Sequence, residues 1–236
     1  MGLEWDSKEV AGYYNDRVEY MSQKNARHKR ICKGLERCHL VYPRTVLDLG
    51  CGTGITSIFM ARQGCQVTGV DLADKLIEYA KEFNSNKNTT YLVGDATEID
   101  LEKEFDIIVL ADCIEHCDPR NLEGLFRNIN KHAHGQTLVY VNLPVDLFQE
   151  FGQDKFEQQI VDNRIPLGML LAMFDSAGFI VADMDTVGLG APLEYYELIF
   201  ITKAHALAVY AECYQIKPAS SDEEVPLDGT LEKENK

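Results

Sequence analysis

The stretch VLDLGCGTG, residues 46–54, constrains the fold of this 236-residue chain more than any other segment. A short apolar run leads into Gly50, Gly52 and Gly54, and a helix-like sequence follows. Glycine is needed where the backbone takes positive φ or approaches a ligand closely. The start of the following helix offers unpaired N–H groups and a partial positive charge, which favour a carboxylate or a phosphate. The stretch therefore predicts a buried strand that ends in a ligand-binding loop.

Strands and helices alternate on both sides of this loop. Apolar and β-branched runs predict strands over residues 45–50, 66–72, 90–96, 105–112, 136–144, 179–187 and 195–203. Helical patterns fill residues 54–64, 73–86, 119–133, with Pro119 at the opening, and 167–178. The alternation predicts an α/β fold with a doubly wound, mostly parallel seven-stranded sheet. The short GLGAPLE linker before the last strand predicts a closing antiparallel hairpin.

Three segments lie outside this alternation. Residues from about Asp6 to Leu40 read as helical, and 145–168 are polar and studded with aromatic residues. Residues 217–236 are polar and acidic, with too few apolar residues to form a core, so we expect a disordered tail. We therefore divide the chain into an N-terminal helical segment, 1–40, a main domain, 41–216, and the tail.

Charge and cysteine usage restrict the function classes. A formal net charge of -15 disfavours a nucleic-acid partner, because phosphate binding needs Lys and Arg. The basic run from Lys24 to Lys33 favours a solvated helix face over a local patch for such a partner. The chain has no leader peptide pattern and no apolar run of membrane-spanning length. Seven scattered cysteines without a CxxC pair favour a reducing, cytoplasmic compartment.

The glycine spacing argues against a dinucleotide site. A GxGxxG fingerprint counted from Gly50 meets Ile55 where the third glycine should stand, and the pattern is GxGxG instead. Asp48 lies on the strand just before the loop. A carboxylate there is awkward beside a pyrophosphate but well placed to accept a hydrogen bond from an ammonium group. The loop therefore favours a ligand with an amino-acid end.

Two further acids end neighbouring strands. Asp71 ends the second strand, where a carboxylate can accept both hydroxyls of an unsubstituted ribose. Asp95 ends the third strand, where it could accept from an adenine amino group while Ala96 lends a backbone N–H. Because the carboxyl ends of parallel strands meet at one edge of the sheet, the sequence predicts a joint site for an amino acid and an adenosine.

The ordered set DLGCGTG, VDLA, GDA and FDIIVLADCIEH resembles class I S-adenosylmethionine-dependent methyltransferases, in the style of the small-molecule branch that includes ubiquinone- and sugar-type enzymes. The resemblance covers roughly residues 40–203. It implies methyl transfer from S-adenosyl-L-methionine to a hydroxyl or amine of a small molecule, with the N-terminal segment as a lid and 145–168 on the substrate side. The implied cofactor-binding residues are Asp48, Gly50, Cys51, Gly52, Gly54, Asp71, Leu72, Asp95, Ala96, Ala111, Asp112 and Tyr14.

His116, after the fourth strand, is the predicted catalytic base, since imidazole takes up protons near neutral pH. A structural role for the Glu115–His116 pair is the alternative, and an amine acceptor needs no base. The predicted substrate residues are Tyr13, Tyr20, Asn142, Phe148 and Phe151, although the aromatic residues could equally pack in the core. We expect no metal ion.

Two other functions compete. A nicotinamide-dependent oxidoreductase could use a related sheet, but Ile55 and the closing hairpin count against it. A non-catalytic protein that binds a cofactor or a partner is the other alternative. The sequence leaves the acceptor and the oligomeric state open.

Overall fold

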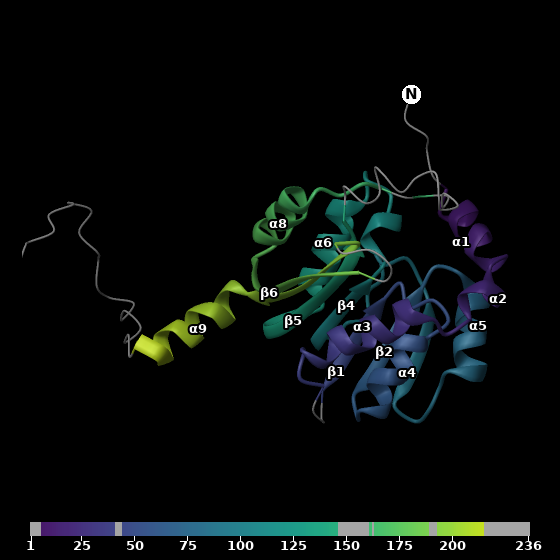
Figure 1. The fold of residues 1–236 in the computed structure, drawn as a ribbon, viewed down its shortest axis with the longest axis horizontal. Coiled ribbons are helices and arrows are strands. Elements are labelled where there is room, and N and C mark those ends of the chain that lie inside the picture. The colour runs from purple at the N-terminus through teal and green to yellow at the C-terminus, as the bar shows by residue number, and fades with distance from the viewer. Residues whose placement is uncertain (1–5, 41–43, 146–160, 162, 189–192, 215–236) are drawn as a thin grey trace, which may run out of the picture.

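The computed structural model describes residues 6–40, 44–145, 161, 163–188 and 193–214, and Figure 1 shows its ribbon. The strands are β1 Thr45–Leu49, β2 Gln66–Asp71, β3 Thr89–Val93, β4 Phe105–Ala111, β5 Ala133–Pro144, β6 Phe179–Val187 and β7 Tyr195–Thr202. They form one sheet in the order β3-β2-β1-β4-β5-β7-β6. The described helices are α1 Ser7–Asn15, α2 Val18–Met21, α3 Ala26–Glu36, α4 Ile55–Arg62, α5 Asp74–Phe83, η1 Ile114–His116, α6 Leu122–Lys131, α8 Leu167–Ser176 and α9 Lys203–Tyr214.

The predicted sheet is confirmed. Strands β1 to β5 pair in parallel, and β7 runs antiparallel to both β5 and β6, so the closing hairpin forms as expected. The strand order reverses between β1 and β4, and the chain leaves these two strands in opposite directions along the sheet. Ligands of such sheets bind at the carboxyl ends of the strands beside this reversal.

Helices cover both faces of the sheet. The core on one face joins α6 and α8 to the sheet through residues such as Leu125, Phe174 and Phe200. The core on the other face joins α3 and α4 through residues such as Leu35, Met60 and Tyr140. Neighbouring strand residues alternate between the two cores because side chains point to opposite faces of a strand. Both faces of the central strands are therefore buried, as their continuous apolar runs predicted.

The N-terminal helical segment is three helices rather than one. The α1 helix starts at the Asp6 cap and contains no buried residue, and neither does α2. A capping box of Asn25 and His28 starts α3. Unlike α1 and α2, α3 belongs to the core, because Ile31 and Leu35 are buried against the sheet.

The close approach of α3 to the sheet depends on Gly34. A Cβ atom at this position would lie 2.5 Å from the Tyr140 hydroxyl and 2.7 Å from Glu197 Oε2. Glu197 is only 3% exposed and pairs with Arg30 at 3.3 Å and Arg37 at 3.7 Å. Burial raises the pKa of the Glu197 carboxyl, while the two guanidinium groups oppose that rise. Arg30 of α3 and Arg37 at its C-cap thus hold this helix on β7 through one buried carboxylate.

Several helix ends differ from the predictions by one to three residues, and one helix was not predicted. The α6 helix begins at Leu122 rather than Pro119, because Asp118 and Arg120 form a local ion pair in the turn before it. The α9 helix was not predicted. It follows β7 directly and extends away from the body at the opposite end from α1 and α2 (Figure 1).

All seven cysteines are unpaired in the structure. Within the described part of the chain, none of the helices has the length and apolar character to cross a membrane. The predicted tail at 217–236 and most of segment 145–168 lie outside the described residues.

Candidate functional site at the carboxyl ends of the strands

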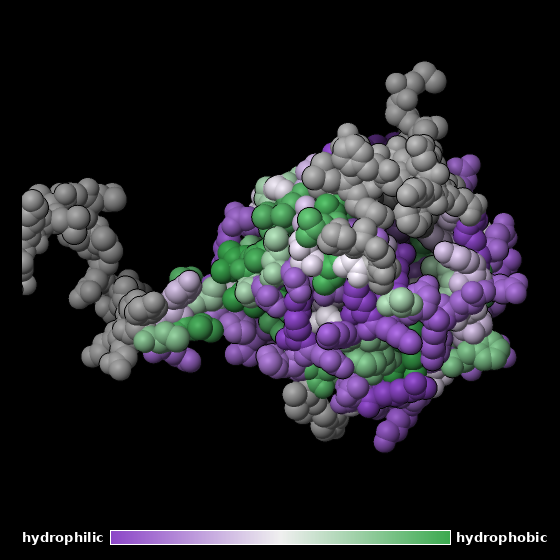
Figure 2. All heavy atoms as spheres, in the orientation of Figure 1, coloured by the Kyte–Doolittle hydropathy of each residue, from purple (hydrophilic) through white to green (hydrophobic). Residues whose placement is uncertain are grey.

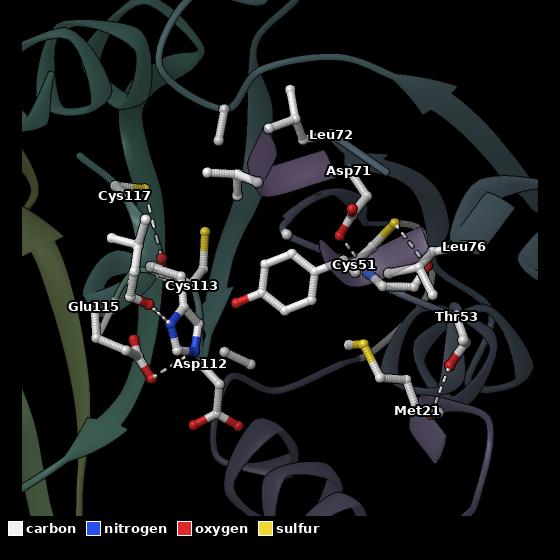
Figure 3. Close-up of a pocket in the computed structure, with 18 of the residues that line it drawn as sticks. Met21, Cys51, Thr53, Asp71, Leu72, Leu76, Asp112, Cys113, Glu115 and Cys117 are labelled. Atoms are coloured by element: carbon white, nitrogen blue, oxygen red, sulfur yellow. Dashed lines mark hydrogen bonds and ion pairs between the residues drawn. The ribbon is translucent and has the colours of Figure 1, made fainter. Parts of the chain in front are cut away.

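A cleft of about 1110 Å³ opens along the carboxyl ends of the parallel strands. Its lining comes from the loops after β1, β2, β3 and β4, from Pro144 at the end of β5, and from α1 to α3. Figure 3 shows Asp112, Cys113 and Glu115 on one side of the cleft and Asp71 and Leu72 on the other. The cleft therefore lies where the strand order places a ligand site.

The glycine loop forms the floor of the cleft. The N–H groups of Gly50 and Cys51 both donate to the Val70 carbonyl, at 2.8 and 3.0 Å, which ties the loop to β2. A Cβ on Gly50 would lie 2.8 Å from Cys113 Sγ, and one on Gly54 would lie 2.6 Å from the Tyr91 hydroxyl. These two glycines therefore permit close packing within the protein.

Gly52 differs from the other two glycines of the loop. Its φ is +53°, and a Cβ there would find only the Met21 methyl group, at 3.6 Å. Its N–H donates to Asp71 Oδ2 at 2.8 Å. Gly52 thus presents its backbone, without a side chain, to the space between the loop and α2, and a ligand there stays a prediction.

The acids at the ends of β2 and β3 both line the cleft. The Asp71 carboxylate accepts from the N–H groups of Gly52 and Ala73, at 2.8 and 2.9 Å, so it also fixes the glycine loop. Burial raises its pKa, and these hydrogen bonds oppose the rise. Asp95 Oδ1 accepts from the N–H and hydroxyl of Thr97, at 2.8 and 2.7 Å. Both carboxylates are therefore held in fixed orientations by neighbouring backbone.

Asp48 does not line the cleft. It is 1% exposed, and its Oδ2 accepts from the hydroxyls of Ser57, at 2.5 Å, and Thr56, at 3.1 Å. Burial raises the pKa of Asp48 to about 6, although the two hydroxyl donors act in the opposite direction. Thr56 itself lines the cleft, so it stands between Asp48 and any ligand there. Asp48 therefore holds the first turn of α4 through two hydrogen bonds.

We expect Asp48→Asn to stabilise the fold near neutral pH. Because the pKa in the folded chain lies above that of an exposed aspartate, the protonated carboxyl stabilises the fold below about pH 4, and this contribution is lost as the pH rises through about 6. The amide cannot ionise, so its gain should be roughly 1–3 kcal/mol at about pH 8 and nearly absent at about pH 4. Urea unfolding at several pH values measures the difference.

Asp106→Asn is the matched control for this pH dependence. Burial raises the pKa of Asp106, but hydrogen bonds from Thr45 and His134 outweigh it and hold the pKa below its ordinary value. Its carboxylate therefore stabilises the fold at neutral pH and loses this effect as the pH falls. We expect Asp106→Asn to destabilise the fold near neutral pH. Parallel curves for the two variants would contradict the assignment of Asp48.

The segment α1–α2 covers the cleft next to the glycine loop. The Thr53 hydroxyl donates to the Met21 carbonyl at 3.1 Å, and Asn15 donates to Asp74 on α5 at 2.6 Å. Tyr13, Tyr14 and Tyr20 all line the cleft. The Tyr14 ring meets the His116 ring edge-on at 6.1 Å between centroids. Burial, with Glu115 and other nearby groups, raises the pKa of Tyr14, so this phenol stays protonated at neutral pH.

Arg27 of α3 is a cleft residue that sequence reasoning missed. Its Nη2 lies 2.5 Å from Asp112 Oδ1. Asp112 follows β4 with φ +52°, an unusual value for a residue with a side chain. Arg30 stacks its guanidinium over the Tyr195 ring at 4.4 Å. The basic run from Lys24 to Lys33, expected as a solvated face, thus sends Arg27 into the cleft and Arg30 toward β7.

His116 lies in the short η1 helix and lines the cleft. Its Nδ1 is 2.8 Å from the Val161 carbonyl oxygen. A carbonyl can only accept, so Nδ1 carries the proton in the neutral ring and Nε2 carries the lone pair. Glu115 Oε1 lies 3.8 Å from that Nε2, and the Glu115 residue is 1% exposed. The pair therefore has the geometry of a base with a carboxylate beside it.

Two described residues of the segment 145–168 hold the η1 turn. Asn163 donates its N–H to the Glu115 carbonyl at 2.8 Å and its side-chain amide to the Cys117 carbonyl at 2.5 Å. These two bonds fix the backbone on both sides of His116, and the Val161 carbonyl holds its ring. Val161 and Arg164 line the cleft, so this end of the segment borders it.

The other predicted residues fall into three groups. Cys51, Leu72, Ala96 and Ala111 line the cleft. Asn142 does not: it is fully buried between β4 and β7, and its amide donates to the Tyr196 carbonyl at 3.4 Å. Phe148 and Phe151 lie outside the described residues. Among the residues that the structure describes, no group of three or more His, Cys, Asp or Glu side chains could hold a metal ion.

Sequence comparison identifies a domain and several relatives. Residues 46–134 match the family model described as a methyltransferase domain. The ubiquinone biosynthesis O-methyltransferase of Rickettsia akari is 33% identical over 131 residues, which make up 53% of this chain and 47% of that protein. The (S)-coclaurine N-methyltransferase of Papaver somniferum is 31% identical over 156 residues, 59% of this chain and 43% of that protein. The chain thus spans about half the length of these relatives.

Solved structures share the fold. The 1,6-didemethyltoxoflavin-N1-methyltransferase of Burkholderia thailandensis, solved with 1,6-didemethyltoxoflavin and S-adenosylhomocysteine, superposes with a TM-score of 0.66 at 18% identity, covering 86% of this chain and 92% of that one. The glycopeptide N-methyltransferase MtfA, solved with sinefungin, gives 0.62 at 14% identity, covering 77% and 95%. At these identities the likeness concerns the fold.

Proposed function

We propose that this chain, which belongs to the class I S-adenosylmethionine-dependent methyltransferases, transfers the methyl group of S-adenosyl-L-methionine to a small molecule. The observation that carries this proposal is the cleft itself. The cleft brings together the exposed backbone of Gly52, the carboxylates of Asp71 and Asp95, and the His116 ring. They lie at the carboxyl ends of four strands. The matched methyltransferase domain runs from β1 to the start of β5 and so includes the carboxyl ends of β1 to β4.

The residues present fit the cofactor. Asp71 and Asp95 are acceptors suited to the ribose hydroxyls and to the adenine amino group, and Ala96 offers backbone next to the latter. Gly52 leaves room for the methionine portion, since nothing but the Met21 methyl group faces its missing side chain. Asp48 would act on the ammonium only through a neighbour such as Thr56. When bound, the sulfonium supplies an activated methyl group, and the protein's task is alignment and exclusion of water.

His116 is the base that we propose for a hydroxyl acceptor. With the proton on Nδ1, Nε2 is the basic nitrogen of the ring, and the buried Glu115 carboxylate would stabilise the imidazolium that forms when Nε2 takes the acceptor proton. Tyr14 cannot play this part because its raised pKa keeps it protonated. An amine acceptor would need no base, and the relatives include both O- and N-methyltransferases.

The acceptor is a small molecule in this proposal. The relatives named above act on small molecules by their names, and the net charge of -15 opposes binding of a polyanion such as a nucleic acid. We further propose a cytoplasmic location, because seven unpaired cysteines suit a reducing compartment.

Isothermal titration with S-adenosylhomocysteine and with NADH tests the proposal. We expect heat and a single site with S-adenosylhomocysteine and no binding of NADH. Binding of NADH alone would favour the oxidoreductase alternative. Binding of S-adenosylhomocysteine without methyl transfer to any acceptor in a broad small-molecule panel would favour a non-catalytic protein.

Asp71→Ala should weaken S-adenosylhomocysteine binding by roughly 1–3 kcal/mol, since hydrogen bonds to a charged group are lost. Asp71 also holds Gly52, so a weaker affinity alone does not prove contact with the ribose. An analogue without the ribose hydroxyls separates the two effects. The wild type should lose affinity for this analogue, and the variant should not distinguish it from S-adenosylhomocysteine. Equal discrimination by both proteins would contradict the ribose assignment.

A further inference from the structure

An apolar surface made of residues that do not line the cleft lies on α8, β6 and α9. Ten large apolar side chains of the described residues are exposed, and six of them belong to these three elements. They are Met169, Val181, Met184, Leu207, Val209 and Tyr210, and we call them the α8–β6–α9 surface. Figure 2 shows apolar residues gathered on this side of the body, toward the base of α9.

The exposed residues of β6 share one face of the sheet. Val181 pairs with Phe200 and Met184 with Leu198, and both partners are buried in the core beneath α6 and α8. Val181 and Met184 therefore face the side of the sheet that α8 covers, but they are 38% and 45% exposed. The α8 helix therefore leaves this part of β6 exposed on the face of the sheet that it covers elsewhere.

The α9 helix is apolar all round. Residues 206–211, ALAVYA, form an unbroken apolar run of six residues, which covers every side of a helix. Only Ala206 among the described side chains of α9 is buried, whereas Leu207 is 69% and Tyr210 58% exposed. A helix without a polar face is normally buried. Among the described residues, α9 contacts the body at its first turn, where Lys203 pairs with Asp175 at 2.9 Å.

We infer that α9 of one copy of this chain packs on Met169, Val181 and Met184 of a second copy. The α9 helix of the second copy packs on the same residues of the first. Such a reciprocal pairing is the usual geometry of a symmetric dimer. The α9 helix starts right after Thr202, which pairs with Phe179 at the beginning of β6, so both halves of the contact lie next to each other in each copy. An exchange of helices would cover Val181 and Met184 and the apolar run of α9 together.

Charge favours this surface for self-association. The chain carries a net charge of -15, so two copies repel one another over most of their surface. The α9 helix carries only Lys203, His205 and Glu212 as titratable charged side chains, and Lys203 is already paired. Residues 215–236 are a poorer cover, because Asp, Glu and Lys interrupt their few apolar residues throughout.

The area is sufficient for a stable dimer. A twelve-residue helix is about 18 Å long and about 10 Å across, so covering most of its side removes roughly 400 Å² from water. Two helices and the two surfaces that receive them give roughly 1,600 Å², which is the size of a standard specific interface. The Thr202 hydroxyl donates to Gly135 at the start of β5, the end opposite the cleft, so both clefts would stay open.

Sedimentation velocity of the full chain without cofactor tests the inference independently of the proposed function. We expect the wild type to sediment at twice its 26.6 kDa, and Leu207→Glu/Tyr210→Glu to sediment as a monomer with unchanged circular dichroism. Phe83→Glu, at an exposed apolar residue on α5, is the control that should stay dimeric. A monomeric wild type at about 100 µM, or a double variant that stays dimeric, would overturn the inference.

Alkylation of Cys213 provides a second readout that needs no variant. This thiol is exposed on α9 in the single chain, so dimerisation should protect it. We expect its reaction with N-ethylmaleimide, followed by peptide mass mapping, to slow as the protein concentration rises. A rate that does not depend on concentration would overturn the inference, and a slow rate in a monomer would place residues 215–236 over α9 instead.

Discussion

Gly52→Val is expected to reduce the affinity for S-adenosylhomocysteine at least about 100-fold while the sheet stays folded. The valine side chain would extend into the space between the loop and Met21, where Gly52 now presents bare backbone. Its φ of +53° also strains any residue with a Cβ, by about 1–2 kcal/mol. The hydrogen bond from its N–H to Asp71 does not depend on the side chain. Titration calorimetry and thermal unfolding measure the two effects separately.

Gly52→Ala separates strain from bulk. Alanine carries the same backbone strain, but its single methyl group would stop 3.6 Å from Met21. We therefore expect a similar loss of stability in both variants and a much smaller loss of affinity in the alanine variant. If the valine variant bound S-adenosylhomocysteine as tightly as the wild type, the methionine portion would lie elsewhere.

His116→Asn is expected to slow methyl transfer to a hydroxyl acceptor by about 10²–10⁴-fold. The asparagine amide can still donate to the Val161 carbonyl, so the η1 turn should keep its contacts. The variant lacks the basic Nε2, and the acidic limb of the pH–rate profile should therefore disappear. Affinity for S-adenosylhomocysteine should change little, because the base would face the acceptor rather than the adenosine.

Glu115→Gln complements this variant. A carboxylate 3.8 Å from Nε2 favours the protonated imidazole, so removing its charge should shift the acidic limb to lower pH without abolishing it. A His116→Asn enzyme that turned over slowly but kept the wild-type pH dependence would identify His116 as a structural residue. The acceptor would then be an amine, or the base would lie elsewhere in the cleft.

The sheet was predictable because each strand carries its own signal. Buried parallel strands such as β1 and β4 read as continuous apolar runs, and Asp71 and Asp95 end such runs where the chain must turn. The closing hairpin followed from two β runs with a short linker. The ends of helices were harder, because the Asp118–Arg120 pair that displaces the start of α6 is a local contact with no strong pattern.

Side-chain directions at the site were not predictable from one sequence. Asp48 and Thr56 lie on consecutive elements, but only the fold shows that the hydroxyl of Thr56 stands between Asp48 and the cleft. Asn142 ends a strand like Asp71, yet β7 pairs beside it and buries it. Arg27 looked like part of a solvated basic face because its partner, Asp112, is 85 residues away in the chain. Long-range pairing decides such cases, and a local pattern does not contain it.

The unequal attachment of the three N-terminal helices determines how molecules can enter and leave the cleft. Ile31, Leu35 and the buried pairs of Arg30 fix α3 to the sheet, whereas α1 and α2 bury no residue and rest on contacts such as Asn15 with α5. We therefore propose that spent cofactor would be exchanged by a swing of residues 7–21 about the turn before Asn25. The rate of this hinge motion would then limit turnover whenever product release is slower than the methyl-transfer step.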